Sequence, residues 1–108
     1  MMSISEELNS LILQRKSIEG DVDYENDQVI QDEIQLMIKD INATVSFLEN
    51  DCTEEQFIWL SEVFDEIAER SKSGEFIAAI RRAAKRFPQA VATYNINYFI
   101  DSAADYIN

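Results

Sequence analysis

The sequence predicts an all-α fold, a compact bundle of about five helices in a single domain spanning residues 1–108. Apolar residues recur at helical spacing along most of the chain, and no segment has the alternation of a strand. Only two glycines and one proline are present, too few for an all-β fold with many tight turns. Apolar residues make up 46% of the chain, enough to fill a core. Stacked antiparallel helix pairs are one arrangement consistent with this pattern.

Residues 3–18 are predicted to form the first helix, which Gly20 ends. The connection 21–27 carries acids at every second position, a spacing that resembles a calcium-binding loop. However, Asn26 stands where such a loop needs its sharp-turn glycine. We therefore interpret this connection as a linker rich in helix-capping residues, and no cofactor is expected.

A long second helix is expected over residues 27–48. Its apolar residues form one main stripe and a second, narrower stripe, so the helix is expected to contact two neighbours. The second stripe consists of Val29, Leu36 and Phe47.

The stretch 49–70 is predicted to be the central helix. Thr53 and Gln56 have the spacing of a capping box, and the residues after them divide into an apolar face and an acidic face. Ile58 lies in the middle of the acidic face, and Trp59 lies at its border as either a core side chain or an interface anchor. The candidate partner-binding residues are Glu54, Glu55, Ile58, Trp59, Glu62, Asp65, Glu66 and Glu69.

The rest of the chain is also predicted to be helical. Ser73 is expected to cap a helix that ends at Phe87, before Pro88. A short helical turn over 89–94 is expected to lead into a last helix over 96–107, with Tyr94 and Tyr98 as secondary surface candidates.

The net charge of −12 argues against nucleic acid and anionic membranes as partners, and favours a basic protein. Solubility alone is the other explanation for this charge. Residues 1–69 carry a net charge of −15 and residues 70–88 one of +5. Two interpretations stay open. Either bases of the second segment pair with the acidic face, or that face is free to meet a partner. The pairs considered join Arg81, Arg82 or Lys85 to Asp65, Glu66 or Glu69.

Enzymatic activity is not expected from this sequence. Histidine is absent, no glycine-rich phosphate loop is present, and Cys52 lies among acids that should raise the pKa of its thiol. Four acids spaced along the central helix could gather a divalent cation, but they point away from the predicted core, and no metal is expected. The single cysteine suits a reducing cytoplasm, and neither a membrane span nor a signal peptide is recognisable, so a cytoplasmic protein is expected.

Several short segments stand out between residues 45 and 107: Phe47-Leu48-Glu49, Cys52-Thr53, Trp59 to Phe64, Glu75-Phe76-Ile77, Phe87-Pro88 and Tyr94-Asn95-Ile96. In these segments the chain resembles small acidic immunity proteins of bacterial contact-dependent growth inhibition systems. The resemblance implies a non-enzymatic protein that binds and neutralises the toxic C-terminal domain of a cognate effector. Many such toxins are nucleases with basic clefts, where an acidic helix could act as a phosphate mimic; an exosite beside the cleft would serve equally well.

An alternative from another class is a helical adaptor or self-assembling structural protein. In that hypothesis the second stripe of the long helix pairs with itself or with a structural partner. The free protein is expected to be a monomer or a weak homodimer.

Overall fold

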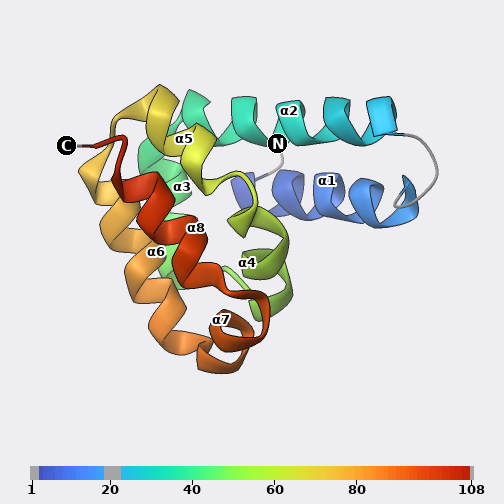
Figure 1. Ribbon diagram of the computed structural model, residues 1–108. Coiled ribbons are helices and arrows are strands. Elements are labelled where there is room, and N and C mark those ends of the chain that lie inside the picture. Colours follow the sequence, from blue (N-terminus) through green and yellow to red (C-terminus); the bar gives the residue numbers. More distant parts are fainter. Residues whose placement is uncertain (1–2, 19–22, 108) are drawn as a thin grey trace.

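Eight helices, rather than about five, make up the part of the chain that the computed structural model describes, residues 3–18 and 23–107 (Figure 1). No strand occurs in these two ranges, and the all-α class is confirmed. The helices are α1 (Ile4–Ile18), α2 (Asp23–Lys39), α3 (Ile41–Asn50), α4 (Glu54–Ser61), α5 (Phe64–Ser71), α6 (Gly74–Arg86), α7 (Pro88–Tyr94) and α8 (Ile96–Ala104).

The helices pack mainly in pairs. α1 lies antiparallel along α2, α3 packs on α6, and α5 packs on α8 (Figure 1). The short α7 contacts α4, α6 and α8. The Cα radius of gyration is 13.0 Å, close to the value of about 13 Å typical of a 100-residue domain. Within the described ranges, no helix combines the length and the apolar character needed to cross a membrane.

The predicted long helix 27–48 is interrupted at Asp40, which separates α2 from α3. Asp40 leaves the helical conformation, and its side chain accepts a hydrogen bond from the backbone N–H of Ala43 as an N-cap. The buried hydroxyl of Thr44 donates to the carbonyl of Met37 at 2.7 Å, which satisfies an acceptor at the end of α2. The prediction of one continuous helix was wrong here because two side chains replace the missing backbone bonds.

The predicted central helix is interrupted as well, at Glu62 and Val63. Its capping box at Thr53 is confirmed, but α4 ends at Ser61 and α5 starts at Phe64. The Ser61 hydroxyl donates to the carbonyl of Ile58 at 2.7 Å. The apolar face survives the break: its members Phe57, Leu60, Val63, Phe64, Ile67 and Ala68 are all buried.

Aromatic contacts hold the two halves of the broken helix to the rest of the core. The Phe57 and Phe64 ring centroids are 5.4 Å apart across the break, and Phe64 meets Phe76 of α6 edge-on at 5.9 Å. Phe57 also contacts Phe87, 5.7 Å away, where α6 ends. Such pairs add about 0.5–1.5 kcal/mol each beyond the area they bury.

The C-terminal part largely follows the sequence prediction. Ser73 caps α6 through a bond from the Phe76 N–H, and Pro88 occupies the first turn of α7. Asn95 adopts a left-handed conformation, with φ of 53°, and turns the chain from α7 into α8. The last helix ends at Ala104 rather than at residue 107, and Tyr106 beyond this end is exposed.

We predict that the capping box of α4 contributes measurably to stability. Thr53→Ala removes the acceptor for the Gln56 N–H and should lower the free energy of unfolding by about 1 kcal/mol. Chemical denaturation measures this change. Thr53→Ser keeps the hydroxyl and should remain close to wild type, so an equal loss in both variants would contradict the capping role.

Candidate functional site

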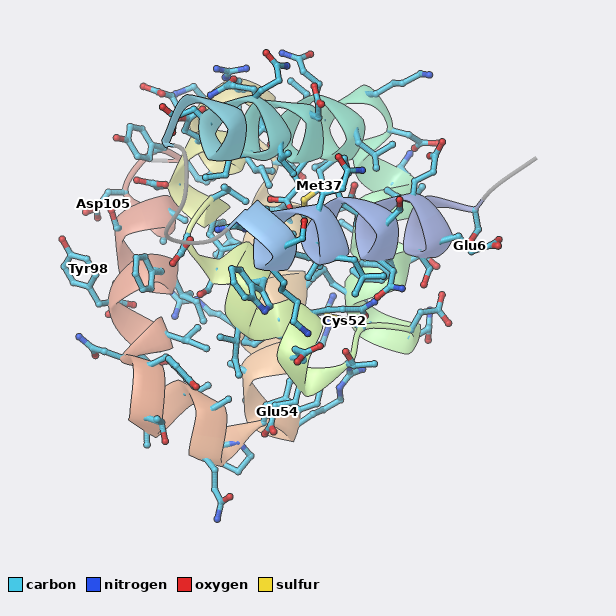
Figure 2. The ribbon with its side chains drawn as sticks, turned by 90° about the vertical axis from the view of Figure 1, so that its right-hand side faces the viewer. Glu6, Met37, Cys52, Glu54, Tyr98 and Asp105 are labelled. Carbon is cyan, nitrogen blue, oxygen red and sulfur yellow. The ribbon has the colours of Figure 1, made fainter. Side chains whose placement is uncertain are left out.

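A groove of about 610 Å³ opens between α4, α7 and α8. One wall is acidic and the other is aromatic, and we call this feature the α4 groove. Figure 2 shows Glu54 at the start of α4 and Tyr98 projecting outward from α8. The groove is lined by Glu54, Glu55, Ile58, Trp59, Ser61, Glu62, Tyr94 and Phe99.

The structure brings five of the eight predicted partner-binding residues together in this groove and leaves three outside it. Glu54, Glu55, Ile58, Trp59 and Glu62 line it. The other three follow the break between α4 and α5 and do not line it; they are Asp65, Glu66 and Glu69. A single acidic face from residue 54 to residue 69 requires an unbroken helix, so that part of the prediction is corrected.

The bases of α6 do not cover the acidic face. Arg82 pairs with Glu49 at 3.1 Å and Arg81 with Asp101 at 3.5 Å. Among the ion pairs of the described residues, none joins α6 to an acid of α4 or α5. Of the two interpretations left open by the sequence, pairing of these bases with the acidic face is therefore not observed among the described residues, and Glu66 instead meets Arg70 on its own helix.

Two bases of α1 meet the acids of the groove instead. Lys16 Nζ lies 2.9 Å from Glu55 Oε1, with both side chains substantially exposed. Arg15 binds Glu62 through its Nη2, but Arg15 itself is only 2% exposed. These two consecutive bases leave the Glu54 carboxylate and part of Glu55 and Glu62 facing solvent.

The apolar side chains of the groove are half-buried. Ile58 and Trp59 each pack one side against the core while also lining the groove, so Trp59 is partly a core side chain and its role as an interface anchor stays a prediction. Opposite them, the Tyr94 side chain is 53% exposed. Tyr98, on the neighbouring turn, is 63% exposed and packs edge-on against Phe99. Exposed tyrosines beside half-buried apolar residues are typical of protein-binding surfaces.

A buried ion pair behind the groove was missed in the sequence. Arg15 Nη1 donates to Glu33 Oε1 at 3.0 Å and to the carbonyl of Trp59 at 2.9 Å. The guanidinium also lies over the Trp59 ring, 4.9 Å from its centroid. Glu33 is 0% exposed. The burial of Arg15 could have been predicted from its position, because it continues the buried helical stripe of Leu8 and Ile12.

Burial raises the pKa of Glu33 from its ordinary value of 4.5 to about 7. The charge and hydrogen bond of Arg15 lower this pKa, but they do not offset the loss of hydration, and the Glu62 carboxylate raises it further. Near neutral pH the Glu33 carboxyl is therefore a mixture of its protonated and ionised forms.

Cys52 is buried and its thiol does not have the environment of a nucleophile. Burial raises the pKa of this thiol to about 12, and Arg86 lowers it by a smaller amount. The predicted direction is confirmed, but its main cause is burial rather than neighbouring acids.

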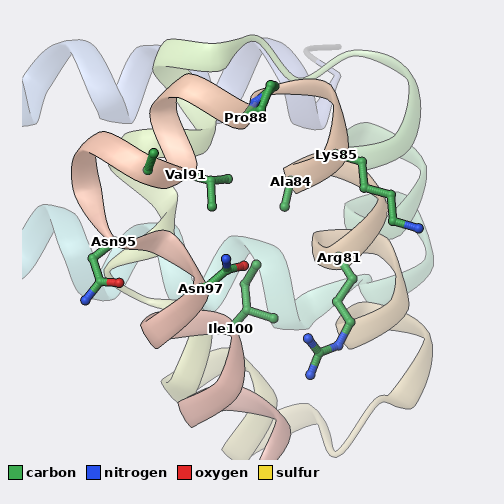
Figure 3. A pocket seen from close by; sticks show the side chains of 9 residues that line it. Arg81, Ala84, Lys85, Pro88, Val91, Asn95, Asn97 and Ile100 are labelled. Carbon is green, nitrogen blue, oxygen red and sulfur yellow. The ribbon is translucent and has the colours of Figure 1, made fainter.

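A second hollow, of about 560 Å³, lies between α6, α7 and α8. Figure 3 shows Ala84, Val91 and Ile100 around its centre, with Arg81 and Lys85 on the α6 side.

No group of three or more metal-ligating side chains occurs within the described part of the chain. The predicted connection 21–27 is corrected in part, because α2 already begins at Asp23; the side chains of residues 21–26 lie outside the described residues.

Comparisons with protein-family models, curated proteins and solved structures found no match to this chain. The resemblance to immunity proteins therefore stays a prediction.

We predict that stability falls with rising pH because of Glu33. At a pH between 4.5 and about 7, Glu33 keeps its proton in the folded protein but has lost it in the unfolded chain. The free energy of unfolding therefore declines from pH 4.5 upward and levels off above about pH 7. The free energy of unfolding should fall by about 1 kcal/mol between about pH 6 and about pH 8. Glu33→Gln should remove this slope.

A matched control for this measurement is Glu49→Gln, which removes a carboxylate paired with Arg82 at the surface. It should keep the wild-type slope. The sequence contains no histidine, so no imidazole contributes in this pH range. A flat wild-type profile would show that Glu33 is ionised in the folded protein throughout.

Proposed function

We propose that this protein is a non-catalytic inhibitor that binds a basic protein domain in the α4 groove. The observation that supports this best is the composition of the groove, in which exposed carboxylates surround half-buried Ile58 and Trp59. Apolar anchors within a charged rim are the usual arrangement of a specific protein interface.

The net charge of −12 supports a basic partner. Opposite charge accelerates diffusional encounter and excludes acidic competitors, while the apolar centre of an interface slows dissociation. The bases of α6 pair elsewhere, and Glu55 and Glu62 stay largely exposed despite their pairs with Lys16 and Arg15, so the groove still offers carboxylates to a partner.

Within this class we favour an immunity protein that neutralises a cognate toxin domain. The resemblance over residues 45–107 points to such a function, and a nuclease toxin would present a basic cleft or its edge to the groove. The carboxylates at Glu54, Glu55 and Glu62 would then stand in for substrate phosphates, or bind an exosite beside the cleft.

The alternative adaptor hypothesis relies on an apolar stripe that is not free. Val29 and Phe47 are buried in the core, and Leu36 is half-buried. Self-association through this stripe would require the bundle to open. We therefore do not favour the adaptor hypothesis.

Removing charge from the rim of the groove should weaken capture of the partner. The first step is to sequence the adjacent reading frame, and a toxin domain found there, inactivated at its catalytic residue, is the probe. Combining Glu54→Gln with Glu55→Gln should reduce affinity by about tenfold at low salt, mainly through the association rate. Surface plasmon resonance at several salt concentrations measures both rates.

The matched control combines Glu66→Gln with Glu69→Gln, which removes the same charge from α5 outside the groove. It should change the association rate much less. Equal losses in the two double variants would mean that net charge, rather than the groove, determines binding. Absence of any binding by the wild type would contradict the immunity function itself.

The apolar centre of the groove should control dissociation. Ile58→Ala should raise the dissociation rate of the same probe by about tenfold, because it removes a half-buried anchor from the interface. Leu13→Ala is the matched control, since Leu13 is 55% exposed on α1 and does not line the groove. An unchanged dissociation rate in Ile58→Ala would place the interface elsewhere.

A further inference from the structure

Arg15 connects the buried Glu33 carboxylate to the wall of the α4 groove. One guanidinium nitrogen bonds both Glu33 and the Trp59 carbonyl, and the other binds Glu62. The flat face of the same guanidinium lies over the Trp59 ring. Trp59 and Glu62 both line the groove, so a change at Glu33 reaches the groove through a single side chain.

The hydrogen bonding of this pair is incomplete. Glu33 Oε2 and Arg15 Nε are buried without a partner, so only one oxygen of the Glu33 carboxylate is bonded. A buried anion with one bare oxygen is poorly compensated, whereas a proton on that oxygen removes the charge. The geometry of this pair therefore favours protonation of Glu33, and only the nearby Arg15 favours the ionised form.

We propose that Arg15 and Glu33 are positioning residues of the α4 groove and that the protonation state of Glu33 sets how strongly Arg15 neutralises Glu62 and holds Trp59. With Glu33 ionised, two carboxylates share one guanidinium and the local net charge is −1. With Glu33 protonated, Arg15 is left to Glu62 alone and the local net charge is zero.

The sign of the coupling to binding follows from these charges. A basic partner is attracted to the groove more strongly when Glu33 is ionised, so binding expels a proton and affinity rises with pH. One linked proton changes affinity by at most about tenfold per pH unit. This part of the inference rests on the proposed function, whereas the link between Glu33 and Trp59 exists in the free protein.

The titration of Glu33 can be distinguished from that of other groups in the protein. Arg15 and Glu62 are the charged groups that act on it, and its pKa of about 7 places the transition near neutrality. The sequence contains no histidine, and the Cys52 thiol titrates far above this range. The other charged groups on the helices packed against α2 are paired, hydrogen-bonded or at least partly exposed: Glu6, Glu7 and Lys16 on α1, Glu49 on α3, and Asp65, Glu66, Glu69 and Arg70 on α5.

Fluorescence of the free protein provides the decisive test. Trp59 is the only tryptophan in the chain, so indole emission reports on this residue alone. Wild type should show a shift in emission with a midpoint near pH 7, and Glu33→Gln should abolish it. The control Glu49→Gln should keep the transition, and circular dichroism across the same range should remain constant.

A second variant tests Arg15 as the connection. Arg15→Lys keeps the positive charge but lacks the planar fork that reaches three acceptors. Carbon NMR of the Glu33 carboxyl should still show a titration in this variant, while the Trp59 shift becomes at most half that of wild type. Because wild type and Arg15→Lys suffice, the test stands even if Glu33→Gln fails to fold. A pH-independent Trp59 emission in the wild type, or an undiminished shift in Arg15→Lys, would overturn the inference.

The coupling to binding is measured with a tetra-arginine peptide as the basic probe. The ratio of affinities at about pH 8 and about pH 6 should be several-fold larger for wild type than for Glu33→Gln. Equal ratios would refute the coupling to binding even if Trp59 titrates. The inactivated toxin domain and the Glu54 and Glu55 variants decide the proposed function separately.

Discussion

The donation of the Arg15 guanidinium to the carbonyl of Trp59 is the interaction on which the candidate site depends. α4 ends two residues after Trp59, and a carbonyl in its last turn needs a donor that a continuing helix would have supplied. Arg15 provides that donor from another helix, and Ser61 provides one for Ile58. The chain can then turn at Glu62 and Val63, so that α5 packs on α8 while α4 presents its acids to the groove.

The same interaction introduces a buried charge that the fold has to accommodate. Burying an ion pair costs several kcal/mol per ion, and replacing such a pair by apolar residues is often neutral or stabilising. The presence of the Arg15–Glu33 pair therefore does not by itself indicate a larger free energy of unfolding. Its geometry is specific, however, because one guanidinium fixes the relative positions of α1, α2 and the end of α4. A buried pair of this kind is better understood as a determinant of the groove than as a source of stability.

Much of the fold could be predicted from local pattern. The periodic apolar residues placed Phe57, Leu60, Phe64 and Ile67 in the core, and the caps at Thr53 and Ser73 are where their spacing indicates. Helical periodicity alone did not predict the two helix breaks. A turn at residues 62–63 leaves the apolar stripe intact, so periodicity gives no sign of it, and one stabilising donor comes from residue 15. At Asp40 a capping signal was present, but helical periodicity on both sides outweighed it.

The sequence by itself determined the all-helical class, the main core positions, the acidity of the segment 54–62 and the absence of histidine. These properties follow from composition and from the period of the helix, which depend on near neighbours in the chain. Tertiary structure alone decided which acids share a surface, that the aromatic wall comes from Tyr94 and Phe99, and that Arg15 meets Glu33. Those relations join residues far apart in the chain. They arise only when packing closes the helices against one another and leaves one guanidinium to satisfy a helix end and two carboxylates.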